Sequence, residues 1–133
     1  MSNNIGTLEK TGLILVLLMI LLQGFYGLFA YIDPAAFSGV RGTVLASELD
    51  VDWVIIYGSR TLFITLVLGY LLYIRQFPIL MWCALFGTVM PITDGLLAYG
   101  AEAHFKVVAK HIATVVYLLI TFFVLKSIVS KKA

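Results

Sequence analysis

The sequence predicts an all-α integral membrane protein, a four-helix bundle with a short interfacial helix after its first span. Hydrophobic residues make up 62% of the 133 residues and charged residues 12%, against roughly 45–50% and 25% in soluble domains. A chain of this length could not bury so much apolar surface in a soluble core, and a disordered chain would be far more polar. Four apolar stretches are each close to the ~20 residues that a helix needs to cross a bilayer, so they indicate four membrane-spanning helices.

The apolar stretches define the expected elements in chain order. We expect one transmembrane domain over residues 1–133, with spans at about residues 11–32, 53–74, 77–99 and 107–125. The first stretch is longer than the roughly 7–15 apolar residues of a signal peptide, so we expect it to be a retained helix. Only Arg75 and Gln76 separate the second and third spans, which predicts that these two are antiparallel neighbours.

The connection between the first and second spans contains a helix-start signature. Asp33 is followed by Pro34, the N-cap residue and the first helical position that helices favour. We expect a short helix there that lies on the membrane surface. Its apolar face would consist of Ala35, Ala36, Phe37 and Val40.

The basic residues predict the orientation. One side of the predicted bundle carries Lys10, Arg75, Lys126, Lys131 and Lys132, and the other carries Arg41, Lys106 and Lys110. Because the cytoplasmic side of a membrane protein is enriched in Lys and Arg, we expect both termini to be cytoplasmic. The membrane we expect is a bacterial inner membrane. The lipid bilayer is therefore one expected partner of the chain. Nine scattered basic residues are too few for a nucleic-acid interface, so no nucleic acid is expected.

Four ionisable residues lie at one level of the predicted bundle, each on a different helix or helix end. Asp33, Arg60, Asp94 and His111 all fall within roughly 10 Å of the outer boundary at 1.5 Å per residue. Ionisable groups in a membrane are costly and need partners or water. We therefore predict a shared pocket in the outer third of the bundle, which Tyr57 extends because it precedes Arg60 by three residues.

These residue types suggest several kinds of chemistry. Arg60 and Asp94 would form a charge pair, or Arg60 would bind an anion or a carbonyl oxygen. His111 would titrate near neutral pH. No metal site is expected, because the usual ligand spacings are missing from the sequence. Pro91, three residues before Asp94, removes a backbone hydrogen bond and would kink the third span beside the carboxylate.

Short motifs carry a resemblance to a known group. They are YIDPAAF at residues 31–37, YGSR at 57–60, PITDG at 91–95, and His111 in the last helix. In this order they resemble small four-helix membrane proteins of unknown function from bacteria and fungi, within the DoxX-like group. The resemblance implies a four-helix bundle, and its family-like positions are Pro34, Gly58, Arg60, Asp94 and His111. Some relatives in that group are associated with quinone-linked oxidation or redox maturation; the single cysteine, Cys83, does not suit thiol–disulfide chemistry.

The first functional hypothesis is binding of a small apolar ligand. A quinone, a lipid or an isoprenoid would enter from the bilayer and lie in a pocket that is apolar below and polar at its outer rim. The predicted ligand-binding residues are Asp33, Tyr57, Arg60, Asp94 and His111. No cofactor is otherwise predicted, although a quinone would suit the pocket.

Other interpretations stay open at this point. A membrane-embedded isomerase, cyclase or quinone-linked oxidoreductase would use His111 and Asp94 as catalytic residues, with His111 as acid or base. The chain would alternatively be an accessory subunit of a larger membrane complex, or a homo-oligomer. The polar residues also have structural interpretations: Arg60 and Asp94 as an ion pair that sets helix register, and Asp33 as a helix cap.

Overall fold

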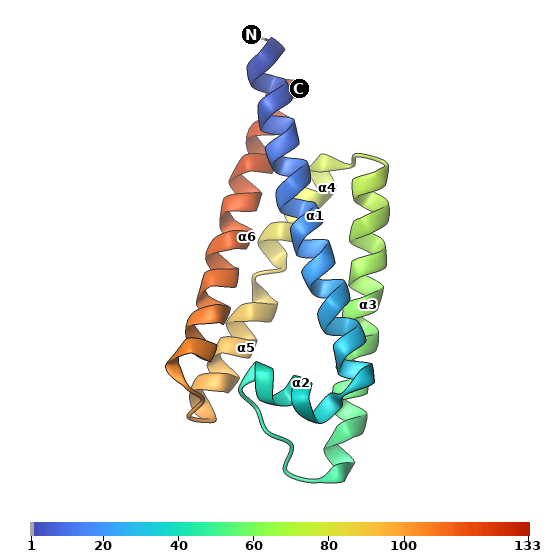
Figure 1. Cartoon of the computed structure of the whole chain (residues 1–133). Coiled ribbons are helices and arrows are strands. Elements are labelled where there is room, and N and C mark those ends of the chain that lie inside the picture. The colour runs from blue at the N-terminus through green and yellow to red at the C-terminus, as the bar shows by residue number, and fades with distance from the viewer. Residues whose placement is uncertain (1) are drawn as a thin grey trace.

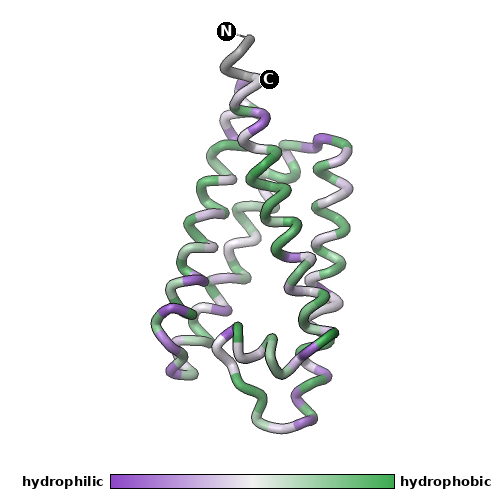
Figure 2. The backbone as a smooth tube through the Cα atoms, in the orientation of Figure 1, coloured by the Kyte–Doolittle hydropathy of each residue, from purple (hydrophilic) through white to green (hydrophobic). Residues whose placement is uncertain are grey.

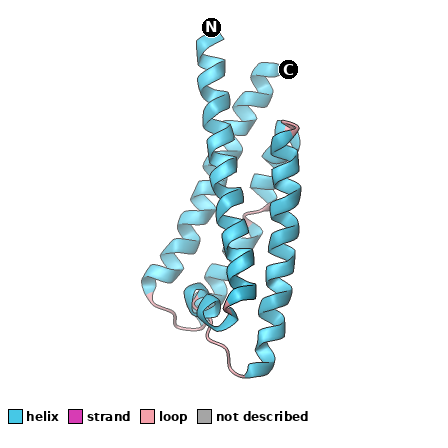
Figure 3. Ribbon diagram, turned by 45° about the vertical axis from the view of Figure 1, so that its right-hand side comes forward, coloured by secondary structure: helices cyan, strands magenta, loops and turns pink. Residues whose placement is uncertain are grey.

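The computed structural model describes residues 2–133, and these residues form an all-helical bundle (Figure 1). No strand occurs among them, as Figure 3 shows by colour. The predicted fold class is therefore confirmed. In chain order the elements are α1 (Ser2–Ile32), α2 (Pro34–Arg41), the 3-10 turn η1 (Glu48–Asp50), α3 (Val51–Tyr73), α4 (Phe77–Phe86), α5 (Val89–Gly100) and α6 (Phe105–Lys132).

Four helical segments of the described chain are long and apolar enough to cross a membrane, which makes this an integral membrane protein. They are Gly6–Ile32, Glu48–Tyr73, Phe77–Gly100 and Phe105–Lys132. Figure 2 shows that hydrophobic positions run along these helices while hydrophilic ones gather near their ends. Many large apolar side chains face outward, as lipid contact requires; Phe63 is 67% exposed and Phe86 66%.

The bundle is assembled around α1 and α6. Helix α1 packs along α3 and also against α6, while α6 packs along both α4 and α5; α3 meets α4 beside their short connection. Two glycines, Gly27 and Gly58, lie where α1 and α3 pack against each other. A Cβ on Gly58 would lie 3.1 Å from both the Ala30 Cβ and the Gly27 carbonyl oxygen, so a larger residue there would push the helices apart.

Pro91 divides the third span. Helix α4 ends at Phe86 and α5 begins at Val89. Because proline has no N–H, the Gly87 carbonyl cannot accept a hydrogen bond from residue 91, and it accepts one from the Met90 N–H at 3.1 Å instead. The predicted kink is thus present as a break one turn before the proline.

Helix α2 lies across the end of the bundle opposite the termini (Figures 1 and 3). Its predicted start is confirmed, since the Asp33 carboxylate accepts a hydrogen bond from the Ala36 N–H at 3.0 Å and Pro34 follows at the first position. Its end is a Schellman turn, in which Gly42 has a φ of 85° and the Thr43 N–H donates to the Ser38 carbonyl.

The apolar face of α2 differs from the sequence expectation at Phe37. This side chain is 1% exposed and packs among Tyr26, Phe29 and Tyr57 of α1 and α3, so it faces into the bundle and not onto the membrane surface. The reason is the space between α1 and α3 at this end, which Phe37 fills together with Ala30 and Val54. Burial of Phe37 fixes the rotation of α2 and so the direction of its last residue, Arg41.

Candidate functional site

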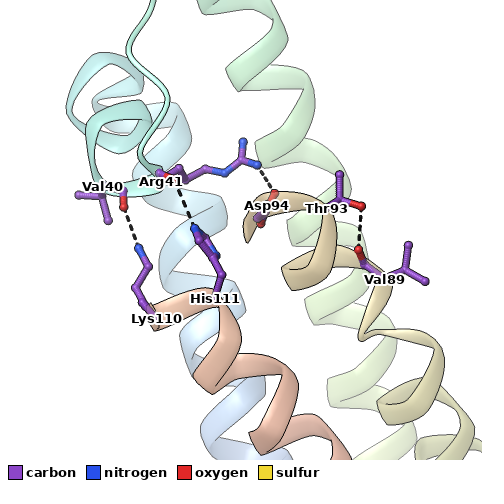
Figure 4. Close-up of polar contacts among 7 residues, drawn as sticks. All are labelled: Val40, Arg41, Val89, Thr93, Asp94, Lys110 and His111. Atoms are coloured by element: carbon purple, nitrogen blue, oxygen red, sulfur yellow. Dashed lines mark hydrogen bonds and ion pairs between the residues drawn. The ribbon is translucent and has the colours of Figure 1, made fainter. Parts of the chain in front are cut away.

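Arg41, the last residue of α2, forms an ion pair with Asp94 of α5. Figure 4 shows its side chain extended from the end of α2 to the carboxylate. The two side chains are 20% and 19% exposed, so the pair is largely sheltered. The guanidinium carbon also lies 4.4 Å from the centroid of the Tyr57 ring and 5.9 Å from that of Phe37. Arg41 therefore connects α2, α3 and α5.

Two residues of α6 reach the last carbonyl groups of α2 (Figure 4). The Lys110 ammonium donates to the Val40 carbonyl at 2.7 Å, and His111 Nε2 lies 3.3 Å from the Arg41 carbonyl oxygen. Terminal helix carbonyls have no partner within the helix and favour nearby cations. Since a carbonyl oxygen only accepts, the His111 contact requires a proton on Nε2. These contacts hold α2 against α6.

A small polar space lies among these residues, and we call it the polar chamber. Its volume is about 80 Å³. Residues from α1, α2, α3, α5 and α6 line it: Leu22, Gln23, Tyr26, Phe37, Arg41, Tyr57, Met90, Pro91, Asp94, Lys110, His111 and Thr114. All five helices that meet at this end of the bundle thus contribute to one site.

A larger space adjoins it at the break between α4 and α5, and we call it the apolar cavity. Its volume is about 300 Å³. The lining is Val16, Met19, Gln23, Phe63, Ile64, Val67, Leu68, Leu80, Cys83, Ala84, Phe86, Gly87, Met90, Pro91, Thr114, Leu118 and Thr121. Its two threonines add little polarity, because the hydroxyls of Thr114 and Thr121 donate to backbone carbonyls of their own helix.

The two spaces share a wall. Gln23, Met90, Pro91 and Thr114 line both of them. The apolar cavity also reaches the outer surface of the bundle, because Phe63 and Val67 of α3 and Phe86 of α4 line it and are exposed. Apolar side chains of α3 and α4 thus surround the part of this cavity that reaches the surface.

The sequence of the chain matches the model of one protein family over nearly its whole length. The family is described as Domain of unknown function (DUF4267), and its model matches residues 13–125. The chain belongs to the DUF4267 family. The match includes every residue that lines the polar chamber and the apolar cavity. No curated protein and no solved structure matches the chain.

Three of the five predicted binding residues of this DUF4267 protein come together in the polar chamber, namely Tyr57, Asp94 and His111. Asp33 does not line it, because its exposed carboxylate caps α2. The interpretation of Asp33 as a helix cap accounts for this contact.

The predicted pair between Arg60 and Asp94 is wrong. Arg60 is exposed, and its guanidinium donates to the hydroxyl of the neighbouring Ser59 at 3.0 Å. The buried side of α3 passes through Val54, Gly58 and Thr61. Arg60 is not among these buried positions and does not line the chamber, although Tyr57, three residues earlier, does. Arg41 stands beside Asp94 instead.

The sequence interpretation missed Arg41, Lys110 and Gln23 as chamber residues. In the sequence Arg41 is one of the basic residues of the outer side, yet it stands just before Gly42, at the end of a helix whose start Asp33 and Pro34 predict. Gln23 is the one amide within residues 11–32, a signal that was available. The residues around Lys110 in the sequence do not distinguish it from Lys106. The two lysines differ only in the folded chain, where the Val40 carbonyl of α2 accepts a hydrogen bond from Lys110.

An acid–base role of His111 would call for a carboxylate partner. Among the described residues, no hydrogen bond joins the His111 ring to a carboxylate. The ring contacts the Arg41 carbonyl, and the Asp94 carboxylate is engaged by Arg41. Within residues 6–133, whose side chains are described, there is also no group of three or more His, Cys, Asp or Glu residues placed to hold a metal ion.

Proposed function

We propose that this member of the DUF4267 family binds a small amphiphile that it takes from the membrane. The apolar part of the ligand would lie in the apolar cavity and its polar head in the polar chamber. The observation that carries this proposal is the wall of four residues common to the two spaces. A quinone, a lipid or an isoprenoid has this division into apolar and polar parts.

The polar head would decide which molecule is retained. A ligand that leaves lipid for the apolar cavity gains little from burial, because lipid tails are as apolar as the cavity wall. Polar contacts therefore have to supply the preference for one amphiphile over the surrounding lipid. The cationic side chains of Arg41 and Lys110 and the Asp94 carboxylate, all in the chamber lining, are the groups that would do so.

The test is native mass spectrometry of the protein released gently from its own membrane. We expect a reproducible bound mass on the wild-type chain that is lost on Arg41→Leu and kept on Arg60→Leu. The two substitutions remove the same charge from the same end of the bundle, but only Arg41 lines the chamber.

The opposite result would restore the sequence-based assignment of ligand binding to Arg60. A wild-type chain that never carries an adduct, from its native membrane or after incubation with decylubiquinone or farnesol, would refute the proposal. Circular dichroism of both variants shows whether a lost adduct reflects binding or unfolding.

We also propose that both termini are cytoplasmic, in a bacterial inner membrane, so that α2 and the polar chamber face the other side. The basic residues support this orientation, because Lys10, Arg75, Lys126, Lys131 and Lys132 lie at the terminal side and Arg41, Lys106 and Lys110 at the α2 side. A green fluorescent protein fused after Ala133 should therefore fluoresce in the bacterial host, and alkaline phosphatase at the same place should be inactive.

A further inference from the structure

We infer that the head of the bound amphiphile is an anionic oxygen acid, a carboxylate or a phosphate monoester, and that Lys110 is its main counter-charge. This inference rests on the proposed function and specifies the class of ligand. The acidic and basic side chains of Asp, Lys and Arg that line the polar chamber are Arg41, Lys110 and Asp94. Arg41 pairs with Asp94, so one positive charge is left that no carboxylate of the chamber balances.

Lys110 is that unbalanced charge. Arg41 and Asp94 neutralise each other, whereas the Lys110 ammonium donates to the backbone carbonyl of Val40 and lies 5.9 Å from the Tyr26 ring. No carboxylate among the described residues lies within ion-pair distance of it. An ammonium has three hydrogen atoms to donate, so two remain for a ligand.

A second cationic donor in the chamber is also unused. The Nε atom of Arg41 is buried and has no hydrogen-bond partner within the described part of the chain. A buried donor without an acceptor is unfavourable. An oxygen acid offers several lone pairs on a small head, and can accept from an ammonium and from a guanidinium N–H together.

The position of Lys110 makes this charge unusual for a membrane protein. It lies five residues after Phe105, the first residue of α6, within the apolar span Phe105–Lys132. At 1.5 Å per residue that is about 8 Å along the helix. A cation at such depth is favourable only with a partner or with water, and a bound anion would supply the partner. Lys106, one turn earlier, is exposed at the helix end and lines neither space.

The experiment compares probes with one tail and different heads. Oleate, oleyl phosphate and oleyl alcohol are titrated into the purified protein in mild detergent, and the bound fraction is measured by native mass spectrometry. We expect at least one of the two anions to bind about tenfold more tightly than the alcohol, the gain that a charge-assisted contact gives. The comparison of oleate with oleyl phosphate shows whether the natural head is a carboxylate or a phosphate.

Lysine variants then test the counter-charge. Lys110→Met should reduce binding of the preferred anion to the level of the alcohol, while Lys110→Arg and Lys106→Met should keep the preference. The arginine variant retains the cation, so it shows whether a loss in the methionine variant comes from charge or from a misplaced α2.

The outcomes separate the two proposals. Equal affinity for alcohol and anions, or equal effects of Lys110→Met and Lys106→Met, would overturn the anionic head while leaving amphiphile binding intact. Failure of all three probes to bind would contradict the proposed function as well.

Discussion

Arg41 makes two contacts that no other residue type can make together. Its guanidinium lies over the Tyr57 ring while a terminal nitrogen pairs with Asp94. The planar, delocalised cation of arginine allows stacking and hydrogen bonding at once, whereas the compact ammonium of lysine does not. At the scale of single residues, this ion pair holds the guanidinium and the carboxylate in place in the polar chamber.

A double-mutant cycle tests the pair. Arg41→Met and Asp94→Ala should each destabilise the protein by about 2 kcal/mol, between the values for exposed and for buried pairs, because one charge is left without its partner. The double variant should be less destabilised than the sum of the two. The measurement is unfolding in mixed detergent followed by circular dichroism.

The Glu9–Arg75 pair provides the control for that cycle. It lies at the other end of the bundle, and its arginine side chain is 60% exposed. The coupling there should be below about 1 kcal/mol, as for exposed pairs in general. Similar coupling energies for the two pairs would show that the shelter around Arg41 and Asp94 adds nothing.

At the scale of elements, the break between α4 and α5 opens the apolar cavity. Phe86, Gly87, Met90 and Pro91 line the cavity and surround the break. A Cβ on Gly87 would lie 2.7 Å from the Cys83 carbonyl oxygen, so this turn requires glycine. The same break carries α5, and with it Asp94, toward α2.

Pro91→Ala should repair the break. It restores an N–H that can donate to the Gly87 carbonyl and so extend α5 toward α4. We expect slower hydrogen–deuterium exchange of the backbone around residues 87–92 and weaker retention of the bound amphiphile, measured by mass spectrometry.

Pro78→Ala is the matched control for the repaired break. Pro78 is exposed in the first turn of α4, where a missing N–H breaks no hydrogen bond of the helix. Unchanged exchange in Pro91→Ala would show that packing of α5 against α6, and not the proline, maintains the break.

At the scale of the whole molecule, buried side chains gather near both ends of the bundle, with the two spaces among them. One cluster contains Phe77, Leu80, Leu125 and Ile128 near the termini, and the other centres on Phe37 beneath α2. Leu80 and Ala84 belong to the first cluster and also line the apolar cavity. The bundle is thus stabilised at its ends and can keep a space between them.

Ala84→Leu fills the apolar cavity without changing a charge. Ala84 is buried in the lining, so the three added carbon atoms would occupy space that the ligand needs. We expect loss of the bound mass together with unchanged or higher thermal stability, since filling a cavity commonly adds about 0.5–2 kcal/mol.

Ala113→Leu makes the same change on an exposed face of α6 that lines neither space. It should leave the adduct in place. An adduct that survives Ala84→Leu as well would mean that the bound molecule lies elsewhere on the protein.

The sequence by itself determined what depends on neighbouring residues along the chain. Four apolar stretches of sufficient length predict four membrane helices, the Asp33-Pro34 pair predicts the start of α2, and Pro91 predicts the interruption of the third span. Each of these follows from hydropathy, capping or a missing N–H, and none requires knowledge of a distant residue.

Only the tertiary structure decided which polar groups meet. Asp94 pairs with Arg41, 53 residues away, and Arg60 turns outward although it lies on the expected span. Helical periodicity relates positions within one helix, but rotation of one helix against another depends on packing. Here the burial of Phe37 between α1 and α3 rotates α2, and that rotation selects Arg41 as the arginine of the site.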